Sequence, residues 1–314
     1  MKAFRINSYG ADPAFESVDT PKPRAGEALV KVAAASINPL DNKLQQGHMY
    51  AFFPLSFSYT IGTDLAGTVE SFGEGDGGFT IGERVVARTA PTAGGAIAEY
   101  AIVPVDQLVR IPAGVSFEDA AGVPTAAGTA WQALFEVAKL KSGQTVLIHA
   151  CAGGVGSFAI QFARAAGARV ITTASGDGIT IAERLGADQV IDYTTEDFTR
   201  HVSNVDLVID TIGGDTQARS FDVLRSGGFL ATTVSPPNEA LAKAHGVSAA
   251  FVFHSSDARR LAAVIDKVAG GVQVLIDRVI DLNDASAGFA RQASGRARGK
   301  IIVSPEAANS RTAT

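Results

Sequence analysis

The chain has 314 residues, 46% of them hydrophobic and 19% charged, which is enough apolar material for a buried core and a length typical of about two domains. Its formal net charge of -5 and the lack of a basic block argue against a nucleic-acid partner. A single cysteine excludes an intrachain disulfide and a multi-cysteine zinc site, and no apolar run reaches the roughly 20 residues of a membrane span.

The first part of the chain, residues 1–117, is predicted to be β-rich. The N-terminal residues follow a strand-like pattern instead of a signal peptide, so we expect a cytoplasmic protein. Glycine and proline separate the later strand candidates, which is typical of a small barrel with irregular loops. These candidates lie at 28–34, 62–70, 84–87 and 97–103.

The pattern changes at Ser116, which is predicted to cap a helix with Asp119 in its first turn. Beyond it, six short apolar segments alternate with helical patterns, which predicts a doubly wound parallel sheet and an α/β fold. The segments are 145–148, 169–173, 189–191, 205–210, 228–234 and 249–253. An amphipathic helix near Leu261 and a strand at 299–303 follow, and the residues from Pro305 onward are predicted to be frayed.

A glycine-rich turn, residues 150–156, joins the first of these strands to a helix. Gly153 leaves room for a pyrophosphate near the backbone, Gly156 lets the helix pack close to the strand, and the helix N-terminus offers N–H groups to phosphates. Cys151 stands where the usual fingerprint has its first glycine, and we interpret it as a small filler residue. A plain strand-to-helix turn is the alternative, but the flanking strand and helix favour nucleotide binding.

The second strand of this region indicates which nucleotide binds. An NAD site places an acidic residue at its end, whereas this strand ends in Thr173, Ala174 and Ser175. Ser175 can donate to a 2′-phosphate, although it can equally be an ordinary turn serine. Asp177 is unfavourable to a phosphate, and Arg184 on the next helix can offset it or face water. This pattern favours NADPH over NADH.

Several motifs, in order along nearly the whole chain, resemble the medium-chain dehydrogenase/reductase superfamily, and within it the zinc-free quinone oxidoreductase branch that includes zeta-crystallin. The motifs lie at 36–41, 62–67, 129–134, 150–156, 185–193 and 298–301. The resemblance implies a GroES-like catalytic domain at 1–117, completed by 257–314. It also implies a Rossmann dinucleotide-binding domain at 118–256.

The metal-ligand positions of zinc-dependent relatives are altered in this chain. Those relatives carry a cysteine and a histidine–glutamate pair where this sequence has Asn38 and Thr63-Asp64. Asn and Thr are poor zinc ligands, and the five histidines are scattered without ligand spacing. We therefore predict no zinc and no flavin. Hydride transfer then requires an acceptor that is already electrophilic, such as a quinone or the β-carbon of an enone.

The resemblance also implies a catalytic loop beside the nicotinamide. Asn38 can donate a hydrogen bond to a substrate oxygen as negative charge develops on it, and Asp41 is predicted to fix the loop. No clear general acid is present, so the proton comes from water, from Tyr50 or from the cofactor ribose. Tyr50 and three nearby aromatic residues can stack on a flat quinone or pack the loop. The predicted substrate contacts are these three aromatic residues, Phe52, Phe53 and Tyr59, together with Thr63.

Further cofactor contacts follow from the same resemblance. Relatives that use NADPH usually carry a tyrosine beyond the third strand, here Tyr193. Thr129 is expected to flank the nicotinamide, with Thr233, Val234 and Phe253 near it, and plain core packing is the alternative for these side chains. The complete predicted set is Thr129, Ala150, Gly153, Gly154, Val155, Gly156, Ser175, Tyr193, Thr233, Val234 and Phe253.

The sequence therefore predicts a zinc-independent, NADPH-dependent quinone oxidoreductase. An alkenal or enone double-bond reductase is the first alternative, and a non-catalytic NADPH-binding sensor or structural protein is an alternative of another class. The last parallel strand, 249–253, is predicted to lie at the sheet edge. The family typically pairs this strand across a dimer, so a homodimer is expected.

Overall fold

The structure, a computed structural model, describes residues 1–305, so the tail predicted to fray lies almost entirely outside the described residues. The chain forms two compact units. The first unit comprises Met1–Thr125 and the residues from Ser256 onward, and the second unit comprises Ala126–Ser255. The chain therefore passes between the units after residue 125 and again after residue 255. The sequence predicted these two boundaries after residues 117 and 256.

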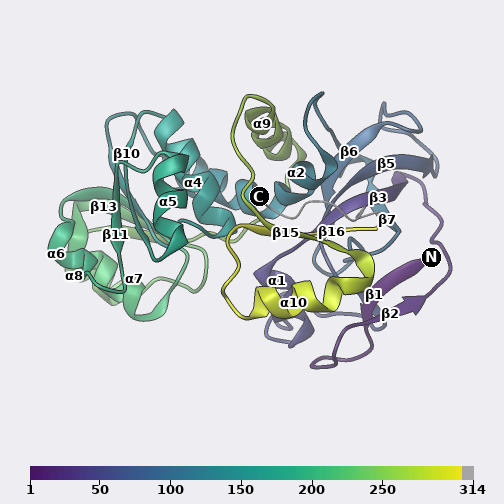
Figure 1. The fold of residues 1–314 in the computed structure, drawn as a ribbon, viewed down its shortest axis with the longest axis horizontal. Helices are drawn as coiled ribbons and strands as arrows, with labels where there is room; N and C mark the ends of the chain where they lie inside the picture. The colour runs from purple at the N-terminus through teal and green to yellow at the C-terminus, as the bar shows by residue number, and fades with distance from the viewer. Residues whose placement is uncertain (306–314) are drawn as a thin grey trace. The chain divides into compact units, whose positions relative to one another are not determined.

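The first unit is built on a seven-stranded sheet in the order β15-β16-β3-β5-β6-β8, with β7 paired to β3 (Figure 1). Its pairs are antiparallel except β15 with β16. The strands are β3 (Glu27–Ile37), β5 (Asp64–Phe72), β6 (Arg84–Arg88), β7 (Tyr100–Pro104), β8 (Val109–Arg110), β15 (Ile276–Asp281) and β16 (Lys300–Ser304). The C-terminal segment thus supplies two strands of a sheet that otherwise comes from the first part of the chain.

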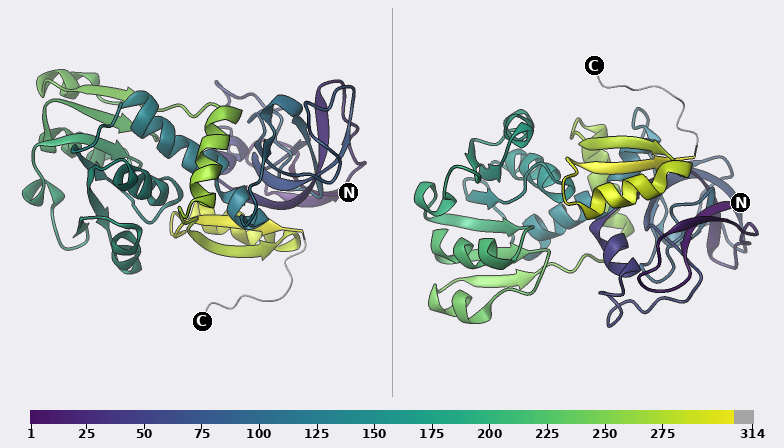
Figure 2. Two further views of the ribbon diagram at one scale, coloured as in Figure 1. Left: turned by 90° about the horizontal axis from the view of Figure 1, so that it is seen from above. Right: turned by 60° about the horizontal axis from the view of Figure 1, so that its bottom comes forward.

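A smaller antiparallel sheet and four α-helices complete the first unit. The small sheet has the strand order β2-β1-β4. Of the helices, α10 packs beside β15 and β16 of the larger sheet, and Figure 2 shows these three elements in yellow. The strands are β1 (Lys2–Ile6), β2 (Ala14–Ser17) and β4 (Tyr59–Thr60). The helices are α1 (Pro39–Gln45), α2 (Phe117–Gly122), α9 (Ala258–Ala269) and α10 (Ala285–Ala293).

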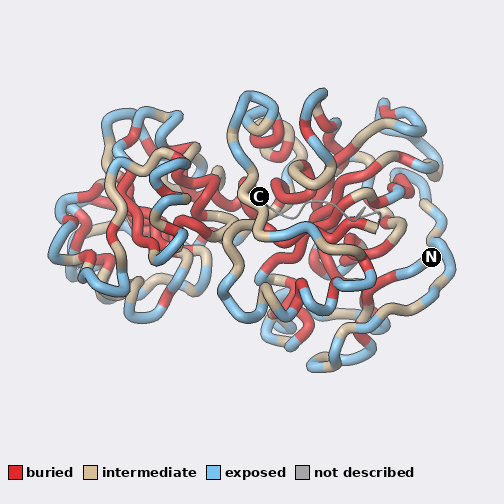
Figure 3. Tube along the Cα trace, viewed as in Figure 1, coloured by how far each residue is buried: buried red, intermediate tan, exposed pale blue. Residues whose placement is uncertain are grey.

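The apolar core of the first unit lies between these sheets and α10. Phe4, Val30, Leu65 and Val85 belong to it, each from a different strand. Figure 3 shows that buried stretches follow the central strands and that many of the exposed stretches lie in the loops. Gly67 is required in β5, because a Cβ there would lie 2.1 Å from the carbonyl oxygen of Lys31 on β3.

The second unit is a six-stranded parallel sheet in the order β11-β10-β9-β12-β13-β14. The strands are β9 (Thr145–Ile148), β10 (Arg169–Ala174), β11 (Gln189–Asp192), β12 (Val205–Asp210), β13 (Leu224–Thr232) and β14 (Ser248–Phe251). Renumbered from β9, the order reads 3-2-1-4-5-6, which is the doubly wound dinucleotide-binding arrangement. The predicted fold class is confirmed, and all six predicted strands are present.

Helices flank this sheet on both faces (Figure 1). Helices α4 (Gly154–Ala165) and α5 (Asp177–Leu185) contact β9, β10 and β11. Helices α7 (Gly214–Ser220) and α8 (Glu239–Ala244) contact β12, β13 and β14, and a single turn, α6 (Phe198–His201), packs in the same core. Helix α3 (Pro124–Trp131) carries the chain into this unit, and a π-helical segment, Gln132–Val137, extends it.

Local signals in the sequence located the start of α2. The predicted cap at Ser116 is confirmed, because its hydroxyl accepts a hydrogen bond of 3.0 Å from the backbone N–H of Asp119. Strand β15 and helix α10 were not predicted from the sequence. Strand β15 lacks a continuous apolar run and its residues are half-buried or exposed, so periodicity alone does not reveal it.

Candidate functional site

The glycine-rich turn after β9 has the shape of a phosphate cradle. Ala150 adopts a left-handed φ of 52°, and Gly153 caps α4. A Cβ on Gly156 would lie 2.5 Å from the carbonyl oxygen of Ala150 and 2.7 Å from the Cα of Cys151. The close approach predicted for Gly156 therefore occurs, but it is to the turn residues Ala150 and Cys151 and not to the body of the strand.

The N-terminus of α4 offers backbone donors beside this turn. The N–H of Ser157 bonds to the carbonyl of Gly153 at 3.0 Å, so the amides of Gly154, Val155 and Gly156 precede the regular ladder of the helix. Gly153, Gly154 and Val155 are partly exposed, while Cys151 is buried against the carbonyl of Gly178. The turn can therefore present amides and a positive helix end to an anion.

Two predicted cofactor residues meet at the ends of β10 and β11. Ala174 and Asp192 are partners in the parallel register, so the residues that follow them lie side by side. The hydroxyl of Ser175 donates to the hydroxyl of Tyr193 at 2.7 Å, and Tyr193 is largely exposed. Two hydroxyl groups therefore stand where an NAD site has a carboxylate.

The remaining predicted cofactor residues lie close to the ends of other elements of the second unit. Thr233 directly follows β13, and its backbone N–H donates to the carbonyl of Asp210 at 2.9 Å. Val234 is exposed, and Phe253 lies beyond β14, where its carbonyl accepts a hydrogen bond from the amide of Gln132. Thr129 is buried in α3.

Asp210, at the end of β12, is a residue that the sequence analysis did not assign. Its buried carboxylate accepts the backbone N–H groups of Ile212 (2.9 Å) and Gly213 (2.8 Å) and the side-chain amide of Gln217 (3.1 Å). These bonds shape the turn after β12, beside Thr233. An acidic residue that ends an apolar strand and precedes Gly213-Gly214 is the signal that could have revealed it.

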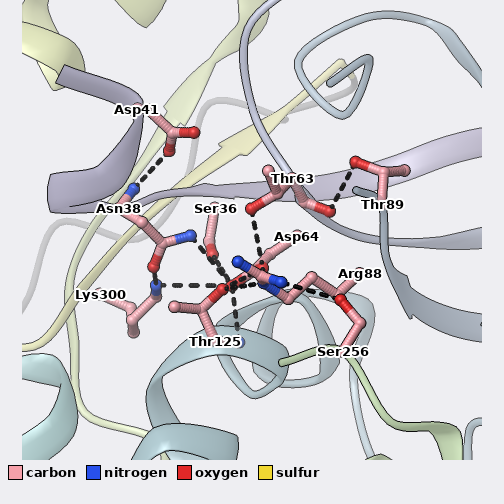
Figure 4. Close-up of polar contacts among 10 residues, drawn as sticks. All are labelled: Ser36, Asn38, Asp41, Thr63, Asp64, Arg88, Thr89, Thr125, Ser256 and Lys300. Carbon is pink, nitrogen blue, oxygen red and sulfur yellow. Dashed lines mark hydrogen bonds and ion pairs between the residues drawn. The ribbon is translucent and has the colours of Figure 1, made fainter. Parts of the chain in front are cut away.

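A second group of polar residues, the Asp64 cluster, lies in the first unit, where all of its members are buried except Thr125 and Ser256, which are half-buried (Figure 4). It consists of Ser36, Asn38, Asp41, Thr63, Asp64, Arg88, Thr89, Thr125, Ser256 and Lys300. The Asp64 carboxylate accepts hydrogen bonds from the backbone N–H of Thr125 (3.0 Å) and its hydroxyl (2.6 Å). The Arg88 and Lys300 side chains each lie 3.9 Å from a carboxylate oxygen of Asp64, so one buried carboxylate faces two cations.

Asn38 belongs to this cluster and is only 2% exposed. Its side-chain N–H donates to Asp64 at 3.0 Å, and its carbonyl oxygen accepts a hydrogen bond from the Lys300 ammonium. One of its two N–H groups is therefore used inside the protein. The substrate-oxygen role predicted from the sequence can only fall on the other N–H.

Asp41 lies at the start of α1 and is also buried. Its carboxylate accepts the backbone N–H of Asn38 at 2.7 Å, which is the kind of contact that a loop-fixing role requires. Burial raises the pKa of the Asp41 carboxyl to about 7, and the nearby Asp64 acts in the same direction. Lys300 and Arg88 lower it, but burial is the larger effect.

The predicted substrate contacts do not form one group. Tyr50 and Phe52 are exposed in the turns after α1, Phe53 is half-buried, and the Tyr50 ring packs edge-on against Tyr9. Tyr59 is 3% exposed in the core of the first unit, where its hydroxyl donates to the carbonyl of Pro91. It pairs with β1 through β4, which the aromatic pattern did not indicate.

Thr63 also lies inside the protein instead of on a surface. Its side chain is fully buried, and its hydroxyl donates to Asp64 at 3.3 Å. In this structure Tyr59 and Thr63 are therefore parts of the interior, and of the four aromatic residues only Tyr50 and Phe52 present a largely exposed ring. A flat substrate can reach those two rings directly.

The histidines and acidic residues do not form a metal centre within residues 1–305, where no three of His, Cys, Asp or Glu are grouped to hold an ion. His149 is buried, and its two ring nitrogens are each 3.0 Å from the hydroxyls of Thr173 and Ser220. Burial lowers the pKa of His149 to about 4, so its ring is neutral. Within residues 1–305, every helix is too short or too polar to span a bilayer.

The similarity to known proteins extends along nearly the whole chain. Residues 24–113 match the family described as alcohol dehydrogenase GroES-like domain, and residues 185–303 match the family described as zinc-binding dehydrogenase. A chloroplast envelope quinone oxidoreductase homolog from Arabidopsis thaliana is 32% identical, over 97% of this chain and 98% of its own length.

Solved structures show the same likeness. The quinone oxidoreductase from Coxiella burnetii has a TM-score of 0.89 at 32% identity, covering 97% of this chain and 99% of that chain. The Escherichia coli quinone oxidoreductase complexed with NADPH has a TM-score of 0.87 at 26% identity, covering 97% of this chain and 100% of that chain. The similarity therefore includes both units.

Proposed function

Because the chain belongs to the medium-chain dehydrogenase/reductase superfamily, in its zinc-free quinone oxidoreductase branch, we propose that it is an NADPH-dependent reductase of quinones or related conjugated carbonyls. The observation that carries the choice of cofactor is the pair of hydroxyls at the ends of β10 and β11. Ser175 and Tyr193 are hydrogen-bonded to each other there, and neither brings the negative charge that would repel a 2′-phosphate.

The residues of the second unit fit NADPH. The Cβ-free position at Gly156 lets α4 approach the turn, and the amides of Gly154 and Val155 are available to the pyrophosphate. Ser175 and Tyr193 would bind the 2′-phosphate. When bound, NADPH supplies the hydride. The protein contributes binding, orientation and exclusion of water, because hydride transfer depends on a close and fixed donor–acceptor geometry.

The Asp64 cluster does not fit zinc, although one matching family is described as zinc-binding. Both oxygens of Asp64 already accept N–H or O–H donors, and Arg88 and Lys300 add positive charge close by. A divalent cation would have to displace these donors and sit beside two cations. Among the ligand positions of zinc-dependent relatives, Asn38 and Thr63 are also poor donors for zinc. An acceptor that needs no metal to polarise it, such as a quinone, fits this arrangement.

On the substrate side, we assign the exposed Tyr50 and Phe52 rings to stacking on a flat acceptor, with the second N–H of Asn38 directed to its oxygen. The candidate proton sources are the same as those predicted from the sequence: Tyr50, whose side chain is 62% exposed, water and the cofactor ribose. The cytoplasmic location remains a prediction from the sequence.

We also propose that the protein is a homodimer that pairs β14 with the same strand of a second copy. β14 ends the six-stranded sheet, and an unpaired edge is commonly covered or paired. Phe251 and Phe253 at this edge are partly exposed. Light scattering coupled to size-exclusion chromatography tests the proposal, and a monomer at micromolar concentration would rule it out.

Oxidation of NADPH and NADH by the metal-stripped protein, with benzoquinone-type and enone acceptors side by side, tests the function. We expect rapid oxidation with quinones and a preference for NADPH. Turnover with enones alone would move the protein to the double-bond reductases. Tight NADPH binding without turnover of any acceptor would instead indicate a sensor or structural protein.

A further inference from the structure

One guanidinium group binds both segments that carry the chain between the units. The chain leaves the first unit after Thr125 and re-enters it at Ser256. The Nε of Arg88 donates to the Thr125 hydroxyl at 2.9 Å, and its Nη1 donates to the Ser256 hydroxyl at 2.8 Å (Figure 4). Arg88 therefore holds two residues that are 131 positions apart in the sequence.

Asp64 completes this clamp from the other side. Its carboxylate accepts both the backbone N–H and the hydroxyl of Thr125, and it lies 3.9 Å from the Nε of Arg88. Asp64 is fully buried and Arg88 is 6% exposed. Thr125 and Ser256 are half-buried, and hydrogen bonds from a buried charged group to such partners are stronger than those at a surface, because water competes less for them.

The clamped residues lie next to the predicted nicotinamide contacts along the chain. Thr125 and Thr129 are both in α3 and are four positions apart, so they lie on one face of the helix, one turn from each other. Ser256 follows Phe253 by three positions. The same Asp64 carboxylate also binds Asn38, the predicted contact of the substrate oxygen.

We propose that Arg88 is a positioning residue for hydride transfer. It fastens the start of α3 and the segment before α9, which continue along the chain to the predicted nicotinamide contacts, to the carboxylate that holds Asn38. This inference rests on the proposed function. A loss of this fastening widens the range of donor–acceptor distances, and a misplacement of about 1 Å can slow such a step about 100-fold.

The test uses three variants that weaken the clamp by different amounts. Thr125→Val and Ser256→Ala each remove one hydroxyl, and Arg88→Lys keeps the charge but cannot span both hydroxyls. Thr125→Ser restores the hydroxyl. Arg84→Lys is the matched control, because Arg84 is on the same strand and donates to the carbonyl of Val115 outside the cluster.

Two measurements need no acceptor. Amide hydrogen exchange compares residues 125–131 and 252–256 in the ligand-free variants. The single tryptophan of the chain, Trp131, ends α3 and packs against Phe135 and Phe162, so energy transfer from it to bound NADPH reports on nicotinamide position. We expect faster exchange in both segments and altered energy transfer in Arg88→Lys, with Arg84→Lys and Thr125→Ser like the wild type.

The third measurement is the single-turnover rate of quinone reduction, with its deuterium isotope effect. We expect Arg88→Lys to slow this step about tenfold or more and to raise the isotope effect, while the Kd for NADPH is unchanged. Looser segments with an unchanged rate would reduce Arg88 to a purely structural role, and unchanged exchange would overturn the clamp itself. If the wild type reduces no acceptor, the proposed function fails, and exchange and energy transfer still decide the clamp.

Discussion

The substitution Lys300→Met tests whether the buried cation of β16 stabilises the first unit. The Lys300 side chain is 4% exposed, and its ammonium donates to the carbonyl oxygen of Asn38 and lies 3.9 Å from Asp64. Methionine has a similar volume, so the change removes the charge and the donor without leaving a large cavity. What it leaves is a buried carboxylate with one cation fewer.

The size of the effect follows from the contacts that are lost. A charge-assisted hydrogen bond is worth about 1.5–3 kcal/mol, and breaking a buried ion pair from one side costs about 3–5 kcal/mol. Arg88 still faces Asp64, which places the expected loss near the lower end, about 3 kcal/mol. For a unit of this size that corresponds to a fall in Tm of about 6–12 °C.

Urea unfolding followed by circular dichroism measures the loss. Arg200→Met is the control, because Arg200 is exposed, lies 4.0 Å from Asp197 and should cost less than about 1 kcal/mol. Adding Asp64→Asn to Lys300→Met would leave the buried Arg88 guanidinium without its carboxylate, so the double variant is expected to lose further stability. If Lys300→Met costs no more than Arg200→Met, the reasoning about the Asp64 cluster is wrong.

Three further results are expected. Ser175→Asp places a carboxylate beside the 2′-phosphate, so the Kd for NADPH should rise about 10- to 100-fold in a fluorescence titration while NADH binding holds; a parallel loss for both would refute the assignment. Gly156→Ala puts a methyl group 2.5 Å from the carbonyl oxygen of Ala150 and should weaken the binding of both NADPH and NADH. Gly270→Ala, where the nearest neighbour of the added methyl group is 3.4 Å away, should leave both Kd values unchanged. Because burial raises the pKa of Asp41 from 3.8 to about 7, the folded protein binds a proton there that the unfolded chain has released, and this group lowers stability as pH rises from about 4 to 7. Asp41→Asn should remove up to about 4 kcal/mol of that dependence, and an unchanged slope of unfolding free energy against pH would contradict it.

Local patterns in the sequence determined much of the second unit. The strand, the glycine-rich turn and the helix at 145–165 are neighbours along the chain, so their pattern is visible in a short window. Alternation of strands and helices then requires a parallel sheet, and parallel strands end at a common edge. For this reason Ser175 and Tyr193 could be named together from the sequence, and the structure brings their hydroxyls to 2.7 Å.

Only the tertiary structure decided which residues surround Asp64. Lys300 and Asn38 are 262 positions apart, and they meet because β16 pairs with β3, the strand that ends next to Asn38. Lys300 stood in a recognised motif, but no local signal says what a buried ammonium faces. Tyr59 likewise followed an aromatic run, and its burial depends on pairing with β1, more than fifty positions earlier. Periodicity reports which face of an element is buried, whereas contacts between distant segments depend on how the sheets pair, and that pairing requires the whole fold.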